Sequence, residues 1–150
     1  MLRQYLIGAA ASVCNIAIHA LVMVTVIKVV RIADAMVTTH QTLRLIAVMS
    51  ASVTVLMIAH LAEVLVWSLT YVIFGVAPDG ADIVYFAFVN YATLGYGDVT
   101  PVVRWHLLGP MTAMNGVLLF GWSTAVIFEV LRMTLLAGDE GDQPKREWPK

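Results

Sequence analysis

The sequence is short of charge and of cysteine. Only 13% of its 150 residues are Asp, Glu, Lys or Arg, and the formal net charge of −1 gives no general attraction to nucleic acid. The single cysteine, Cys14, excludes a disulfide within the chain, and its apolar neighbours predict a small buried side chain. Hydrophobic residues, in contrast, make up 60% of the chain, well above their usual share in a soluble domain. We therefore expect an integral membrane protein that does not bind nucleic acid.

Three apolar runs have the length that a membrane-crossing helix requires. The hydrocarbon core of a bilayer is about 30 Å thick, and roughly 20 helical residues cross it. The runs extend from about Tyr5 to Val30, Leu45 to Val76 and Trp105 to Leu136. A cleaved signal peptide is the alternative for the first run, because Ala33-Asp34-Ala35 resembles a cleavage site, but a signal peptide has a much shorter apolar region. We predict an all-α protein with three retained transmembrane helices.

The segment between the second and third runs, Ala77 to Arg104, is too polar to cross the membrane twice. Asp79 or Asp82 can cap a short helix that reaches about Ala92, and a glycine-containing stretch follows it. Non-helical backbone at membrane depth must be covered by protein or line a water-filled cavity, because lipid offers it no hydrogen bonds. We therefore predict a re-entrant loop that lines something polar.

Basic residues predict the orientation of the chain in the membrane. Acidic residues mark the re-entrant segment, with Arg3 and Arg104 as basic exceptions on that side. The positive-inside rule places the first connection and the C-terminus in the cytoplasm. The basic residues in those two regions are Lys28, Arg31, Arg44, Arg132, Lys145, Arg146 and Lys150.

The re-entrant segment contains the motif Thr93-Leu94-Gly95-Tyr96-Gly97-Asp98. Glycine adopts positive φ without a Cβ clash, so Gly95 and Gly97 permit a backbone whose successive carbonyls point to one side. The stretch Tyr91 to Pro101 closely resembles the selectivity filter of potassium channels, in which such carbonyls replace the water around a dehydrated K⁺. The resemblance covers residues 45–136, in the order outer helix, pore helix, filter and inner helix.

The resemblance implies a homotetramer that conducts K⁺ passively across a lipid bilayer. One chain supplies one strand of carbonyls, so several copies must close the ring around the ion. Asp98 would lie at the pore mouth and attract cations, while Tyr96 would pack away from the pore axis. Potassium is the permeant ligand, and we expect neither a cofactor nor enzymatic activity. The residues expected to bind K⁺ are Thr93, Leu94, Gly95 and Tyr96, with Gly97 completing the filter.

Two residues depart from the usual pattern of potassium channels. Leu94 replaces the more frequent valine but leaves the carbonyl unchanged, whereas Ala92 stands where threonine or serine is usual and removes a hydroxyl below the filter. Tyr85 and Phe86 occupy positions where the family often has tryptophan. We expect these changes to affect conductance and selectivity more than the type of protein.

The resemblance also predicts the domain organisation. Residues 1–44 form an N-terminal transmembrane helix with a cytoplasmic connector, residues 45–136 form the pore domain, and residues 137–150 form a polar cytoplasmic tail. The expected location is the plasma (inner) membrane of a prokaryote.

Glycines and ionisable residues within the runs are further candidates for function. Gly116, or alternatively Gly121, is a candidate gating hinge in the inner helix, and close helix packing is the competing interpretation. His60 and Glu63 lie three residues apart and therefore on one face of the second run. Such a pair inside a membrane either senses protons or forms structural hydrogen bonds.

Two other functions remain open at this stage. The chain could be a non-conducting or modulatory subunit, or a membrane enzyme that uses His60 and Glu63, although no nucleophile or complete ligand set accompanies the pair. The sequence does not place His19, His40 or His106 near the pair, so we predict no metal site there. A voltage sensor is not expected, because no run carries regularly spaced arginines.

Overall fold

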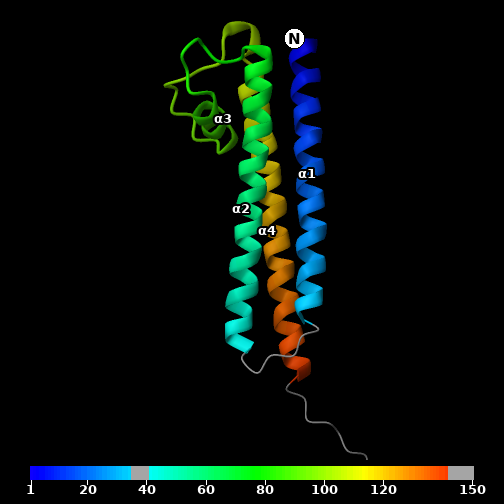
Figure 1. Ribbon diagram of the computed structural model, residues 1–150. Helices are drawn as coiled ribbons and strands as arrows, with labels where there is room; N and C mark the ends of the chain where they lie inside the picture. The colour runs from blue at the N-terminus through cyan, green and yellow to red at the C-terminus, as the bar shows by residue number, and fades with distance from the viewer. Residues whose placement is uncertain (35–40, 142–150) are drawn as a thin grey trace, which may run out of the picture.

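The computed structural model describes residues 1–34 and 41–141, and every element in these ranges is a helix. The long helices α1 (Leu2–Asp34), α2 (Gln41–Phe74) and α4 (Leu108–Gly141) lie side by side, as Figure 1 shows. The short helix α3 (Ile83–Tyr91) and its loops lie beside one end of this bundle (Figure 1). A 3₁₀ turn, η1 (Val103–Trp105), leads into α4.

The three long helices confirm the predicted membrane spans. Stretches of these helices, Leu2–Arg31 and Gln41–Phe74, together with Val103–Leu136, which includes η1, are long and apolar enough to cross a membrane. α2 has 34 residues, so at about 1.5 Å per residue it is roughly 50 Å long and must tilt or extend beyond a bilayer core of about 30 Å.

The helices also extend beyond the predicted apolar runs. α2 begins at Gln41, before the apolar run, and α4 continues to Gly141, into the segment expected to be a polar tail. The reason is that a helix satisfies its own backbone hydrogen bonds, so it continues past the bilayer surface without apolar side chains. The rest of the expected tail, from residue 142 onward, lies outside the described residues.

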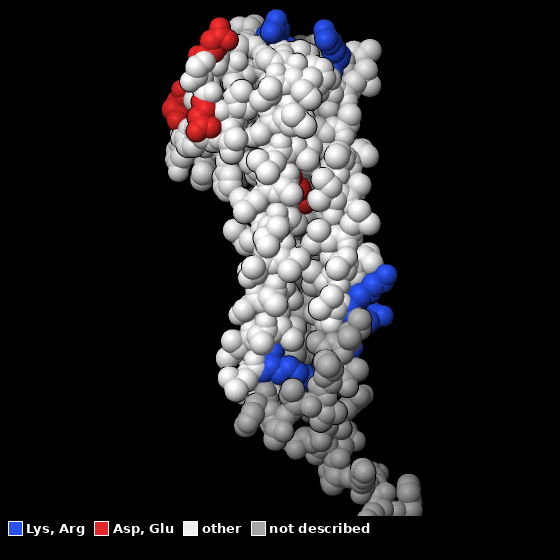
Figure 2. All heavy atoms as spheres, viewed as in Figure 1, with Lys and Arg blue, Asp and Glu red and all other residues white. Residues whose placement is uncertain are grey.

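α1 and α4 run in the same direction, and α2 runs against them. At the end of the bundle near α3, the N–H of Leu107 donates to Gln4 Oε1 at 2.9 Å. At the other end, Arg44 Nη2 donates to the carbonyl of Thr134 at 2.9 Å. Charged side chains gather toward the two ends, with the acidic ones mostly near α3, and little charge is visible over the middle (Figure 2). This arrangement suits a chain whose middle lies in lipid.

The bundle has two apolar cores, and a layer of buried polar side chains lies between them. α1 contributes to both cores, so it packs as closely as the other long helices. The core near α3 includes Ala11, Val64, Trp67, Tyr71, Phe86, Ala87, Tyr91, Trp105 and Leu108, and the opposite core comprises Met23, Val26, Val30, Leu56, Val126 and Val130.

The prediction for Cys14 was wrong, because this residue lies on the exposed face of α1. The buried face of α1 carries instead the polar residues Asn15 and His19, both 0% exposed. In a soluble protein the apolar face of a helix is the buried one, but a membrane helix is apolar toward lipid as well, so apolar neighbours do not indicate burial.

Candidate functional site

Asp82 fixes the start of α3. Its Oδ1 accepts the backbone N–H of Tyr85 at 3.0 Å, which satisfies one of the free donors at the helix start. Of the two aspartates predicted as caps, the structure selects Asp82. The nine residues of α3 then cover about 14 Å, less than half of a bilayer core, as a re-entrant helix requires.

The end of α3 leads directly into the predicted filter. The N–H of Leu94 donates to the carbonyl of Val89 at 2.9 Å, and the N–H of Thr93 to that of Asn90 at 3.1 Å. These are the paired bonds of a Schellman motif, in which Thr93 takes the left-handed position with φ 60°. A β-branched residue is strained there by about 1–2 kcal/mol. Strain of this kind is typical of functional sites.

Gly95 and Gly97 have the positive φ values that the motif predicts, 57° and 79°. A Cβ added to either glycine would meet no other atom within 4 Å in the chain, so glycine is needed here for the backbone angle. The neighbouring side chains of Leu94 and Tyr96 are 51% and 67% exposed. Most of the Tyr96 side chain is therefore left uncovered by the described residues, and the packing expected of it requires another molecule.

The end of the predicted filter is tied back to α3. The hydroxyl of Tyr85 donates to Asp98 Oδ2 at 2.7 Å. This hydrogen bond raises the pKa of Tyr85, because loss of the phenol proton would place two negative charges side by side. Tyr85 thus holds the predicted pore-mouth carboxylate in place.

Of the two hinge candidates, Gly116 lies at a close contact between α4 and α3. A Cβ on Gly116 would clash with the carbonyl oxygen of Tyr91 and lie 3.1 Å from its carbonyl carbon, whereas a Cβ on Gly121 would meet nothing within 4 Å. Close packing therefore accounts for Gly116. α4 is helical through both glycines, and their role as hinges stays a prediction.

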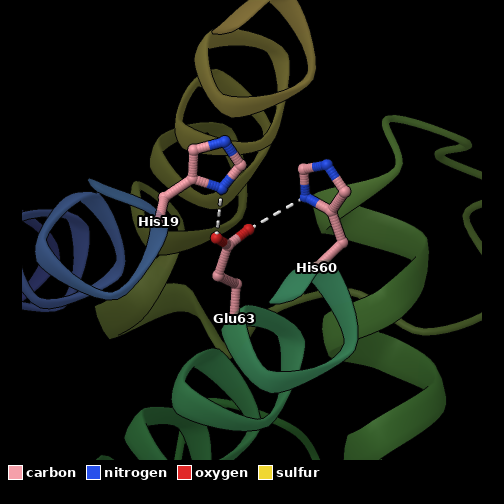
Figure 3. A group of neighbouring side chains, drawn as sticks. All are labelled: His19, His60 and Glu63. Atoms are coloured by element: carbon pink, nitrogen blue, oxygen red, sulfur yellow. Dashed lines mark hydrogen bonds and ion pairs between the residues drawn. The ribbon is translucent and has the colours of Figure 1, made fainter. Parts of the chain in front are cut away.

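The polar layer centres on Glu63, which the structure joins not only to His60 but also to His19. His19 Nδ1 lies 2.6 Å from Glu63 Oε1, and His60 Nδ1 lies 2.9 Å from Glu63 Oε2 (Figure 3). The hydroxyl of Tyr91 also donates to Glu63 Oε2. Glu63 and His19 are 0% exposed, and His60 is 8% exposed. One carboxylate thus connects α1, α2 and α3.

α4 completes this polar layer through Ser123. Its Oγ lies 2.9 Å from His60 Nε2 and 3.3 Å from His19 Nε2, so the hydroxyl bridges the far sides of the two imidazoles. We call His19, His60, Glu63, Tyr91 and Ser123 the polar cluster. Four helices meet in it.

Two asparagines fix the backbone on which the polar cluster is built. Asn15 Nδ2 donates to the carbonyl of Glu63 at 3.2 Å and to Asn115 Oδ1 at 3.0 Å. Trp67 Nε1 also donates to Asn115 Oδ1, at 3.0 Å. These bonds hold α1 and α4 at one turn of α2, the turn that carries Glu63.

Comparison with known proteins adds one finding. A protein-family profile described as an ion channel matches residues 59–133, which include half of α2, α3, the loop and most of α4. The chain belongs to this ion channel family. No curated protein and no solved structure matches the sequence.

The matched region of this ion channel chain includes most of the residues described above. The predicted filter and four members of the polar cluster lie within residues 59–133. His19 lies outside, on a helix that the family profile does not cover. The Glu63 carboxylate of the channel domain is therefore hydrogen-bonded to a buried side chain, His19, from the preceding helix α1.

Sequence reasoning missed His19, Tyr91 and Ser123 as members of one cluster. The one signal available was the presence of His19 inside a membrane run, where ionisable residues are costly and have a specific role. His106 is exposed near the start of α4 and does not belong to the cluster, and His40 lies outside the described residues.

Proposed function

We propose that the chain is a potassium-selective channel subunit that conducts K⁺ passively through a homotetrameric pore. The observation that carries the proposal is the loop Thr93–Asp98 in a chain of the ion channel family. This loop follows a short helix, has positive φ at Gly95 and Gly97, and lies between two helices able to cross a membrane. These features suit a filter of backbone carbonyls that replaces the hydration shell of K⁺.

The exposure of the loop supports assembly from several copies. Every residue from 93 to 98 is exposed in the single chain. Lipid cannot satisfy the polar backbone of such a loop, so protein or a water-filled pore must surround it in the membrane. Copies of the same chain provide both, since each adds one strand of carbonyls, and four such strands form the potassium filter.

In this assembly, the ion meets oxygen atoms from two sources. The backbone carbonyls of Thr93, Leu94, Gly95 and Tyr96 bind K⁺ along the axis, and the hydroxyl of Thr93 adds an oxygen at the inner end. α3 ends immediately before Thr93, so the partial negative charge of its C-terminus stabilises a cation there. Asp98 raises the cation concentration at the mouth.

The proposed orientation places α3 and the filter mouth outside and the α1–α2 connection inside. It rests on the positive-inside rule, with Lys28, Arg31 and Arg44 flanking that connection. The C-terminus is then cytoplasmic. We propose the plasma (inner) membrane of a prokaryote as the location.

The test is ion flux in liposomes that contain only the purified protein. Potassium flux should exceed sodium flux, barium should block it, and Gly95→Ala should abolish the selectivity while the protein still inserts. The oligomeric state of the same sample should be measured by mass in detergent or lipid nanodiscs. A correctly assembled tetramer that stays silent under every condition would contradict conduction by this chain and favour a modulatory subunit.

A further inference from the structure

We propose that His19, His60 and Glu63 form a proton-binding site that holds one shared proton and transmits its state to the filter through Tyr91. The site itself follows from the geometry of the polar cluster. Its effect on ion flux rests on the proposed channel function.

Hydrogen bonding favours one shared proton over none when both imidazoles donate to Glu63. When both imidazoles carry hydrogen on Nδ1 and donate it to Glu63, both Nε2 atoms are acceptors, and both face Ser123 Oγ, at 3.3 Å from His19 and 2.9 Å from His60. A hydroxyl has one hydrogen, so it can satisfy only one of them. One added proton removes the conflict, because one Nε2–H then donates to Ser123 and the Ser123 hydroxyl donates to the other Nε2.

Charge balance allows at most one shared proton. The titratable groups that face each other here are His19 from α1, His60 and Glu63 from α2 and Tyr91 from α3, while α4 supplies the neutral hydroxyl of Ser123. With one imidazolium, the carboxylate is neutralised. A second imidazolium would leave a net positive charge among buried side chains, which is expensive at membrane depth.

The proton can also rest on Glu63 without changing this count. A neutral carboxyl can donate to His60 Nδ1, His60 Nε2–H to Ser123, Ser123 to His19 Nε2, and His19 Nδ1–H to the other carboxyl oxygen. Every group is again paired, and the net charge is again zero. Transfer between the two arrangements moves hydrogens along existing bonds and needs no other reactant.

The distances favour a proton over a metal ion. The ligand atoms of His19, His60 and Glu63 all lie within 4.8 Å of one another, close enough to consider a metal. Two ligands about 2.0–2.1 Å from a tetrahedral Zn²⁺ are roughly 3.3 Å apart. The nitrogen–oxygen separations here are 2.6 and 2.9 Å, which are hydrogen-bond distances.

Tyr91 connects the proton site to the conduction path. Its hydroxyl donates to Glu63 and lies 2.9 Å from His60 Nδ1, while its backbone is the last residue of α3, two positions before Thr93. Its carbonyl also packs against Gly116 of α4. A change in the charge of Glu63 or His60 therefore alters the hydrogen bonds that hold the end of α3, and with it the filter.

The first experiment measures the protonation state of the two imidazoles directly. In the full-length protein with ¹⁵N-labelled histidine, NMR should find one imidazolium shared between His19 and His60. Glu63→Gln should turn both into neutral imidazoles. His106→Gln is the matched control, because His106 is exposed and outside the cluster. This variant should remove its own signal alone.

Two results of the NMR experiment would overturn the site. One is a pair of neutral imidazoles in the wild-type protein that Glu63→Gln leaves unchanged. The other is stoichiometric binding of added Zn²⁺ that shifts both signals. Neither result depends on ion flux, so the site is decided even when the channel is silent.

The second experiment tests the coupling to the filter. Wild-type potassium flux should change about fivefold or more between about pH 5 and 8, where histidine charge changes occur and where a typical coupling energy has this effect. His19→Gln should remove most of that dependence, and His106→Gln should retain it. Active protein whose flux is independent of pH, or equally pH-dependent in His19→Gln, would overturn the coupling.

Discussion

The filter loop and the polar cluster differ in how complete they are within one chain. The loop residues 93–98 are all exposed, and 67% of the Tyr96 side chain is left uncovered by the described residues. The polar cluster is buried, and its groups bond to one another across all four numbered helices. The proposed filter therefore needs other molecules to be completed, whereas the hydrogen bonds of the cluster are complete within one chain. Substitutions in the loop should therefore reduce ion flux, whereas substitutions in the cluster should reduce stability.

The largest effect on function should come from Gly97→Ala. Alanine at positive φ costs about 1–2 kcal/mol, and the cost recurs in each of four copies around a filter. Selective potassium flux in liposomes should be lost. The chain itself should fold normally, because a Cβ on Gly97 meets nothing within 4 Å. Circular dichroism and membrane insertion should therefore match the wild type.

Normal potassium selectivity in Gly97→Ala would show that the function of the loop does not depend on glycine at this position. Gly80→Ala is a useful control, since Gly80 also has positive φ, 80°, and an open surrounding, but lies before α3. It should carry the same backbone strain and keep its selectivity.

The sequence was sufficient for the backbone geometry of the loop at Gly95 and Gly97 because the information there is local. The motif, the capping residue Asp82 and the positive φ of Gly95 and Gly97 all depend on residues a few positions apart. Apolar runs likewise predicted the three spans, since length and composition decide whether a helix can cross a membrane.

The polar cluster could not be derived in the same way. Its bonds join residues 44 positions apart for His19 and Glu63 and 63 apart for His60 and Ser123. Membrane helices are apolar on their lipid-facing side as well as inside, so no periodic pattern shows which face of α1 is buried. The left-handed φ of Thr93 was also unforeseen, because a Schellman motif usually places glycine where this β-branched residue stands.

The largest effect on stability should come from Glu63→Ala. It leaves His19, His60 and Tyr91 buried without their common acceptor, and removing one partner of a buried ionic cluster costs about 3–5 kcal/mol. The loss should appear as a lower unfolding midpoint in detergent. Glu63→Gln retains an oxygen acceptor and should lose clearly less.

An unfolding midpoint for Glu63→Ala equal to that of the wild type would show that the polar cluster contributes little to the stability of the bundle. It would mean that the four helices are held mainly by their two apolar cores. Asn15→Ala would then be expected to have no effect either, although Asn15 ties α1 to the carbonyl of Glu63 and to Asn115.

Gly116→Ala should have an intermediate effect, because it lies where the two regions touch. The added Cβ would clash with the carbonyl of Tyr91 and push α4 away from the end of α3. Overpacking of this kind costs about 1–3 kcal/mol. Both the unfolding midpoint and the potassium flux should fall.

Gly121→Ala is the matched control for the hinge hypothesis. Its Cβ would meet nothing within 4 Å, so packing is unchanged, and alanine favours the helix over glycine by about 1 kcal/mol. Stability should be retained or rise slightly. A loss of flux in Gly121→Ala without loss of stability would identify Gly121, rather than Gly116, as the hinge.

The smallest effect should come from Tyr85→Phe, which removes the 2.7 Å hydrogen bond to Asp98 at the exposed edge of the loop. An exposed hydrogen bond contributes little to stability, so the unfolding midpoint should hardly move. The pKa of Tyr85 is raised by this bond, so the phenol stays protonated through neutral pH, and the bond is lost only as the pH rises through that raised value, above about 10.

The substitution should therefore reproduce at neutral pH what strong alkali does to the wild type, namely release of the pore-mouth loop from α3. Hydrogen exchange of the amides around Asp98 measures this release, and it should be faster in Tyr85→Phe while the amides around Glu63 stay protected. Equal acceleration at both places would show that the loop and the polar cluster open together as one unit. In that case a proton bound at Glu63 would act on the whole end of the bundle near α3, because the proposed filter would not respond independently of the helices behind it.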